Sequence, residues 1–180
     1  MSVFVKLKHY LRIGQFGSII PGLIINDQPA PYPVLNERAI RASAGIIFAA
    51  GFFAFFHAVY LDDFVFLKFL AAFLFIDFFI KVLLGPHLSP ISLLANYIVR
   101  NQKPEYVGAI QKRFAWSIGL VLSGIMLVLL FILSVSGLAN LIICGVCLTF
   151  MFMESAFGIC VGCKLYHALI SYGLITKPIH

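Results

Sequence analysis

The sequence contains few charged residues for its length. Asp, Glu, Lys and Arg make up 11% of the 180 residues, whereas a soluble domain carries about a quarter. Hydrophobic residues make up 62% of the chain, and its mean hydropathy is +1.02. A chain this apolar cannot cover itself with polar side chains, which excludes an ordinary soluble domain and indicates a membrane protein.

Several motifs with a defined chemistry are also absent. The sequence has no HExxH pair and no phosphate-binding glycine loop, and it has no internal repeat of the kind that marks inverted-repeat transporters. Its four cysteines are too few for a disulfide scaffold. The net charge is +6, but the basic residues flank the apolar runs, so we expect the lipid bilayer and no nucleic acid as a partner.

Four apolar runs are long enough to cross a bilayer, since a transmembrane helix needs about 20 residues. They cover residues 42–61, 64–84, 114–135 and 138–163. Runs of this length predict helices, because the strands of a membrane β-barrel would be ~10-residue segments of alternating hydrophobicity. We therefore predict an all-α integral membrane protein built as a four-transmembrane-helix bundle, in which each helix satisfies its own backbone hydrogen bonds.

A shorter amphipathic helix is predicted between the second and third spans, over residues 89–100. Ser89 is suited to cap this helix and Pro90 to occupy its first position. Its apolar residues recur at helical spacing, at Ile91, Leu94, Ala95 and Ile98. Such a stripe predicts an interfacial helix that lies along the membrane surface rather than crossing the bilayer.

The predicted spans divide the chain into an N-terminal cytoplasmic or interfacial segment (1–35), a four-span membrane domain (36–166) and a C-terminal tail (167–180). With four spans, both termini and the loop between spans two and three share one side. Of the 13 lysines and arginines, only Lys68 falls on the other side. Because basic loops stay in the cytoplasm, we expect a multi-pass inner (plasma) membrane protein with cytoplasmic N- and C-termini.

Four short blocks of the sequence stand in a distinctive order. They are residues 34–45 (VLNERAIRASAG), residues 77–81 (DFFIK) with the later Gly85-Pro86 and Ser89-Pro90 pairs, residues 112–119 (KRFAWSIG), and Glu154 with residues 157–163 (FGICVGC). In this order they resemble a bacterial membrane family that is catalogued as domain of unknown function number 4395. The resemblance covers residues 34–166 and implies a membrane location and a CxxC motif, but no particular reaction.

The cysteines form two CxxC motifs, Cys144/Cys147 and Cys160/Cys163. Two such pairs resemble a zinc or iron–sulfur ligand pattern. On one continuous helix, however, Cys147 and Cys160 would lie about 20 Å apart and on different faces. A shared four-cysteine metal centre would require a helix break at Gly158 or contacts between two copies of the chain, so we predict no metal site.

The two motifs lie in different settings. Cys144 and Cys147 lie among aliphatic residues in the outer half of the fourth span, where cysteine packs as a small hydrophobe, and they form a second candidate dithiol. Cys160 and Cys163 lie at the cytoplasmic end, beside Lys164, which favours a thiolate. We predict that Cys160 and Cys163 are the catalytic pair. The alternative is a structural pair at a glycine-rich helix end.

Six charged residues are expected at similar depth near the cytoplasmic end of the bundle. An isolated carboxylate such as Glu154 costs about 2.5–3.5 kcal/mol in lipid, so it needs a partner. The expected polar cluster comprises Arg38, Arg41, Asp77, Lys81, Arg113 and Glu154. It serves either as a charge-balanced clasp between helices or as a pocket for an anionic or polar substrate beside the cysteines.

The leading functional hypothesis is thiol–disulfide or sulfane-sulfur (persulfide) exchange between Cys160/Cys163 and a cytoplasmic thioredoxin-like or rhodanese-like protein. Two alternatives stay open. One is a small transporter or channel for a sulfur-containing anion or a metal ion, and the other is a non-catalytic scaffold in which the cysteines only pack. The sequence indicates no cofactor, does not decide whether the protein is an enzyme, and is compatible with a homo-oligomer.

Overall fold

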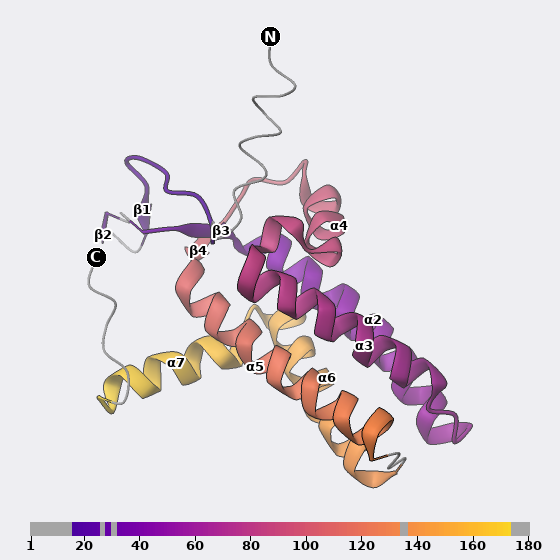
Figure 1. Cartoon of the computed structure of the whole chain (residues 1–180). Coiled ribbons are helices and arrows are strands. Elements are labelled where there is room, and N and C mark those ends of the chain that lie inside the picture. The colour runs from indigo at the N-terminus through magenta and orange to yellow at the C-terminus, as the bar shows by residue number, and fades with distance from the viewer. Residues whose placement is uncertain (1–15, 26–27, 30–31, 134–136, 174–180) are drawn as a thin grey trace.

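The computed structural model describes residues 16–25, 28–29, 32–133 and 137–173, and in this part the chain is mainly helical (Figure 1). The α-helices are α2 (Glu37–Tyr60), α3 (Val65–Phe79), α4 (Pro90–Val99), α5 (Ala109–Leu127), α6 (Leu138–Phe157) and α7 (Val161–Ser171). Two of them are extended by π-helical turns, α3 by Ile80–Leu84 and α5 by Val128–Ile132, and a 3₁₀ turn at Pro86–Leu88 precedes α4. The expected N-terminal segment up to residue 15, the end of the third span (134–135) and the tail from residue 174 lie outside the described residues.

Three helical segments, Glu37–Tyr60, Ala109–Ile132 and Leu138–Phe157, are long and apolar enough to cross a membrane. The outer surface of the bundle is apolar as well, since large side chains such as Phe69 and Ile132 are more than 70% exposed, at 73% and 74%. A surface of this kind suits lipid rather than water. The prediction of an all-α membrane protein is therefore confirmed at this level.

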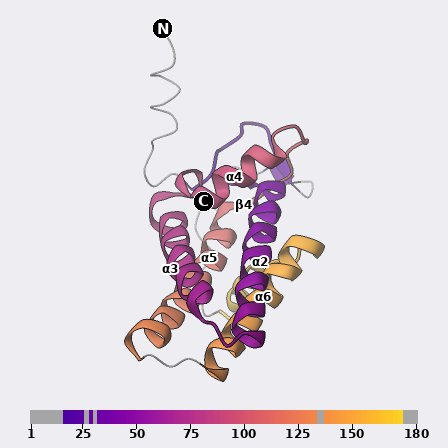
Figure 2. The ribbon, with the colours of Figure 1, turned by 90° about the vertical axis from the view of Figure 1, so that its right-hand side faces the viewer.

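The long helices α2, α3, α5 and α6 form a bundle, and the shorter helices α4 and α7 lie outside it. α2 contacts α3, α4 and α6, while α5 contacts α3 and α7. Figure 2 shows α4 lying across one end of the bundle and α7 projecting from its side. One buried cluster, around Ala54, Leu67 and Leu130, fills the end near the turn between α2 and α3, and a second, around Phe78 and Trp116, lies nearer to α4.

Two short antiparallel strand pairs, which sequence reasoning did not anticipate, lie at the α4 end. The strand β1 (Ile24–Ile25) pairs with β2 (Gln28–Pro29), and β3 (Val34–Asn36) pairs with β4 (Tyr106–Gly108). Because β3 leads directly into α2 and β4 directly into α5, their pairing holds the first turns of both helices at the same end of the bundle. The described part of the expected N-terminal segment is therefore joined to the membrane domain by backbone hydrogen bonds.

Local sequence signals account for several helix ends. Asn36 caps α2 by accepting a hydrogen bond from the backbone N–H of Arg38 at 3.1 Å, and Ser89 caps α4 by accepting one from Ser92 at 3.1 Å. Pro90 occupies the first position of α4, where its missing N–H costs nothing. Gly85 adopts a φ of 120°, which ends the second helix at the predicted place, because glycine tolerates positive φ.

The fourth predicted span, 138–163, is wrong at its end. α6 stops at Phe157, Gly158 takes a left-handed conformation with φ 68°, and α7 begins at Val161 in a new direction. The apolar run concealed this break, since composition does not distinguish one helix from two that meet at a glycine. The break places Cys160 and Cys163 at the start of a separate helix rather than at the end of the fourth span.

The amphipathic helix is present, but its buried face differs from the predicted stripe. Ile91 and Ala95 are buried against α2, whereas Leu94 and Ile98 point outward at half exposure, 50% and 55%. The buried positions that replace them are Ser92 and Val99. α4 therefore has one apolar face against the bundle and another that is open.

Candidate functional site

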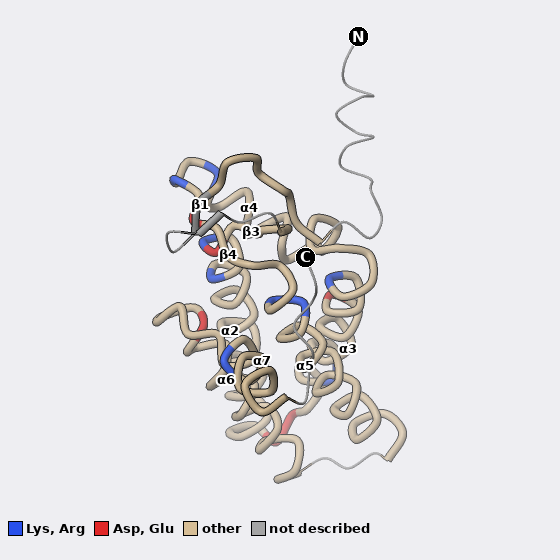
Figure 3. The backbone as a smooth tube through the Cα atoms, turned by 90° about the vertical axis from the view of Figure 1, so that its left-hand side faces the viewer, with Lys and Arg blue, Asp and Glu red and all other residues tan. Residues whose placement is uncertain are grey.

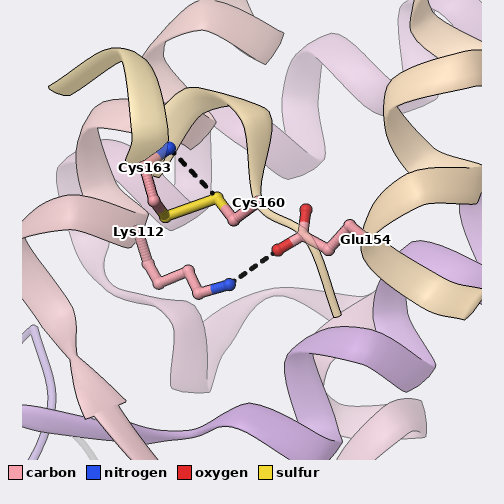
Figure 4. Close-up of a disulfide and its surroundings, with 4 residues drawn as sticks. All are labelled: Lys112, Glu154, Cys160 and Cys163. Atoms are coloured by element: carbon pink, nitrogen blue, oxygen red, sulfur yellow. Dashed lines mark hydrogen bonds and ion pairs between the residues drawn. A yellow bond between two sulfur atoms is a disulfide. The ribbon is translucent and has the colours of Figure 1, made fainter. Parts of the chain in front are cut away.

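Cys160 and Cys163 form a disulfide across the first turn of α7, with their Cα atoms 5.2 Å apart (Figure 4). Cys160 is the N-cap of this helix, and its sulfur accepts a hydrogen bond from the backbone N–H of Cys163 at 3.3 Å. Cys160 is buried, whereas Cys163 is partly exposed. The start of a helix favours negative charge, so a thiolate released at Cys160 is stabilised where it forms.

A nearly buried ion pair lies beside the disulfide (Figure 4). Lys112 of α5 donates from its Nζ to Oε1 of Glu154 on α6 at 2.8 Å, and the two side chains are 4% and 13% exposed. Glu154 thus has the partner that its position required, but sequence reasoning missed Lys112. The signal was its place on the inward face of α5, where Ala109, Trp116 and Ser123 are also buried at helical spacing.

The other acidic residue of the expected cluster forms its own buried group. Asp77 pairs with Lys81 one turn later at 2.7 Å and accepts a hydrogen bond from Ser89 at 2.6 Å. Lys81 also donates to Ser43 of α2 at 3.2 Å. This group joins α2, the end of α3 and the start of α4, as a clasp between helices does.

The three arginines of the expected cluster lie apart from one another. Arg38 pairs with Glu105 at the surface. Arg113 donates to the carbonyl of Val82 at 3.2 Å and stacks on the ring of Phe16. Arg38, Arg113 and the Asp77 group therefore each have direct partners of their own.

Arg41 lies at the helix break. It donates to the carbonyl oxygens of Ser155 and Ala156 at 3.4 and 3.2 Å, which belong to the last turn of α6 and have no partner within that helix. A Cβ added to Gly158 would lie 3.4 Å from the guanidinium. Arg41 therefore supports the turn that leads into the disulfide.

Gly162 allows α7 to pack closely on α5. A Cβ at this position would lie 2.6 Å from the Cβ of Ala115, which no side chain tolerates without a shift. The ring of Tyr166, one turn further along α7, packs against Phe114 at 5.3 Å between centroids. The two contacts hold the disulfide-bearing end of α7 against α5.

A cavity of about 180 Å³ lies between the helices, and both CxxC motifs contribute to its wall. Cys144, Cys147 and Glu154 line it from α6, and Cys160 lines it from the start of α7. Cys144 and Cys147 carry free thiols, with Cys144 buried and Cys147 partly buried. The predicted second dithiol thus packs in the core and also faces the same space as the disulfide.

A structural metal ion needs several ligating side chains around one point. Among the described residues, no group of three or more His, Cys, Asp or Glu side chains is arranged to hold a metal ion. Cys144, Cys147 and Cys160 line a common cavity, but they do not form such a group.

Comparison with known proteins identifies the family but no individual relative. Neither the curated proteins nor the solved structures contain a match to this chain. The family model described as "Domain of unknown function (DUF4395)" matches residues 35–171, a range that includes α2 to α7, the Lys112–Glu154 ion pair and both CxxC motifs. The chain therefore belongs to the DUF4395 family.

Proposed function

We propose that the protein is a membrane thiol oxidoreductase in which Cys160 and Cys163 cycle between disulfide and dithiol by exchange with a soluble partner. The observation that carries this proposal is their pairing at disulfide distance across the first turn of α7. A buried cysteine pair that only fills space needs neither a helix start nor a neighbouring ion pair. Thiol exchange benefits from both, because a thiolate forms during the reaction.

The difference in exposure gives the order of steps. A thiolate of the partner attacks the sulfur of Cys163, which is the more exposed of the two, so one S–S bond forms to the partner while the bond to Cys160 breaks. Cys160 leaves as a thiolate, held by the N–H of Cys163. A second thiol of the partner then attacks the mixed disulfide, releases Cys163 and leaves the partner oxidised by two electrons.

The position in the membrane is part of the proposal. The continuous helix from Val65 to Leu84 serves as a further membrane-spanning helix, although it contains three charged residues, Lys68, Asp77 and Lys81. α4 lies at the interface, where its outward apolar face contacts lipid. Figure 3 shows that lysine and arginine concentrate toward the end of the bundle that carries β3 and β4, which supports a cytoplasmic location for this end and for the site.

The partner in the cytoplasm is a thioredoxin-like protein. A rhodanese-like sulfur carrier is the second candidate partner. Both present a reactive cysteine, and both keep their thiols reduced in the cytoplasm. A partner that carries a persulfide would transfer a sulfur atom rather than electrons, by giving its outer sulfur to the reduced thiol of Cys163. The inner membrane is the location in which one protein meets both lipid and such a partner.

Thiol trapping in cells tests the proposal. Acid quenching followed by alkylation with a mass-tagged maleimide reports how many cysteines are reduced, and we expect the Cys160/Cys163 pair to be present in both states. A thioredoxin-like partner that keeps its attacking cysteine but lacks its second cysteine should accumulate as a mixed disulfide with Cys163 of the wild-type protein, because no second thiol of the partner resolves it. The matched control is Cys144→Ser with Cys147→Ser, which should leave this trapping unchanged. If this one-cysteine partner forms no mixed disulfide with the wild-type protein, and Cys163 never carries a persulfide, the proposal is refuted.

The transporter alternative fits the geometry less well. A path for an anion or a metal ion needs polar groups that are free to bind it. Asp77 and Lys81 instead bind each other and Ser89 and Ser43, and Glu154 binds Lys112. The scaffold alternative predicts that Cys160→Ser and Cys163→Ser change neither phenotype nor stability, so the trapping experiment separates it from exchange.

A further inference from the structure

We infer that the cavity between the helices is a quinone site, in which a lipid-soluble quinone removes the two electrons that the Cys160/Cys163 pair receives. This inference rests on the proposed function and names the second substrate of the same site. Repeated exchange with a soluble dithiol requires that the disulfide be formed again after each turnover. An electron acceptor must therefore reach the buried sulfur from a side that the soluble partner does not occupy.

The cavity lies on that side of the disulfide. It reaches Cys160 from the interior of the bundle, while the partner approaches the more exposed Cys163. Its wall is formed mainly by aliphatic and aromatic side chains, including Leu70, Phe78 and Met126. A lining of this kind repels nucleotide cofactors, whose phosphates need charged or hydrogen-bonding partners, and accepts an apolar ring.

The volume also suits a single ring. A dry apolar cavity of ~150 Å³ is known to take up benzene, and this one measures about 180 Å³. Water is a poor occupant, because a buried water needs about three polar partners and most of the wall offers none. We place the isoprenoid tail outside the cavity, along the apolar outer surface of the bundle.

The wall of the cavity also contains a few polar side chains that are available to the ring oxygens. Glu154 lines the cavity together with Cys160, and its carboxylate is held in place by Lys112. Ser123 adds a hydroxyl on α5. A ligand that fits must be apolar over most of its surface and polar at its ends, as a quinone ring is.

The electron balance closes with this acceptor. The reduced pair loses two S–H bonds and gains one S–S bond, while the quinone gains two O–H bonds and becomes a quinol. Two electrons and two protons thus pass from Cys160 and Cys163 to the two ring oxygens. Glu154 is the side chain in the cavity that carries a proton between sulfur and ring.

The only tryptophan in the sequence provides a probe for binding. Trp116 is buried on α5 in one cluster with Phe78, which lines the cavity, so a bound quinone should quench its fluorescence. The full-length protein in nanodiscs is titrated with a short-tailed ubiquinone, and an isoprenoid alcohol of the same tail length serves as the control. We expect saturable quenching by the quinone and none by the alcohol.

Two variants on the same helix test the location. Ser123→Phe fills the cavity from a side chain that is 8% exposed, and Val121→Phe adds the same ring at a position that is 60% exposed and outside the cavity lining. We expect at least tenfold weaker quinone binding in Ser123→Phe and wild-type binding in Val121→Phe. Thermal unfolding establishes that each variant is folded. If Ser123→Phe is not folded, the wild-type protein is photolabelled with an azidoquinone instead. The labels should then fall on peptides of α5 and α6.

Electron transfer is measured on the same samples. The protein is reduced, freed of reductant and mixed with ubiquinone, and the quinol is followed by its absorbance, with one equivalent expected per Cys160/Cys163 pair. Cys160→Ser with Cys163→Ser should bind quinone but reduce none. Absence of saturable quenching in the wild type, or equal binding by Ser123→Phe and Val121→Phe, would overturn the quinone site while leaving thiol trapping unaffected. Failed trapping together with intact quinone binding would instead remove the exchange function.

Discussion

Replacing Gly162 by alanine tests how α7 is held against the bundle. The added Cβ would lie 2.6 Å from the Cβ of Ala115 and 2.8 Å from its Cα. Carbon atoms in favourable contact are ~3.5–4.0 Å apart, so α7 must move away from α5 by about 1 Å. The opposing atoms belong to the backbone or are attached directly to it, so no side-chain rotation relieves the contact.

The expected result is a loss of both stability and site geometry. Over-packing of this kind costs about 1–3 kcal/mol, so we expect the free energy of unfolding in detergent to fall by that amount. The shift also moves Cys160 and Cys163 relative to α5, so their rate of reduction by a small dithiol should change. Gly145→Ala is the matched control, because a Cβ there meets nothing within 4 Å. It should raise stability by about 0.5–1 kcal/mol, as alanine does when it replaces glycine inside a helix.

A second substitution shows whether the contact itself is responsible. Ala115→Gly removes the nearer of the two opposing atoms, so the double variant with Gly162→Ala should recover part of the lost stability, a coupling that a double-mutant cycle measures. If Gly162→Ala unfolds at the wild-type temperature and its disulfide is reduced at the wild-type rate, α7 does not pack on α5 as described and the reasoning fails.

Three further substitutions test the polar contacts and the helix break. Lys112→Met leaves Glu154 without its partner and should lower the free energy of unfolding by about 3–5 kcal/mol. The double variant with Glu154→Gln should recover most of this loss. An unchanged unfolding midpoint in Lys112→Met would contradict the buried pair. Ser89→Ala removes the cap of α4 and a hydrogen bond to Asp77, at a cost of about 1–3 kcal/mol in thermal unfolding, whereas Ser89→Thr should retain most of the stability and an equal loss in both would argue against the cap. Gly158→Ala places a residue with a Cβ in a left-handed conformation and should lower the free energy of unfolding by about 1 kcal/mol. Gly158→Asn should lower it less, because asparagine tolerates that conformation. If the two variants are equally stable, the turn is not left-handed.

The features that the sequence predicts correctly are those that depend on neighbours along the chain. The helix start at Ser89 and the helix end at Gly85 follow from capping and from glycine conformation, which are properties of a few adjacent residues. Asp77 and Lys81, both expected in the polar cluster, are also local to each other, since they are one turn apart. Family membership followed from short blocks that are local in the same sense.

The features that were missed depend on how helices meet. Lys112 and Glu154 are on different helices, and nothing in either segment identifies the other as its partner. The strands β3 and β4 are three residues each, too short to show an alternating pattern. The break at Gly158 lies in a run that remains apolar on both sides, so hydropathy carries no signal of it. The cavity could not be predicted either, because its wall is formed by several helices whose packing must be known first.

The break at Gly158 also explains why an arginine stands near the start of α2. Ending a helix inside or next to a membrane leaves carbonyl groups that water cannot satisfy, at a cost of several kcal/mol each. Arg41 donates to two of them, on Ser155 and Ala156, so the turn is stable without water. This turn lets Cys160 both cap α7 and line the cavity, a combination that a continuous α6 would not permit. We therefore propose that Arg41 acts as a positioning residue for the disulfide.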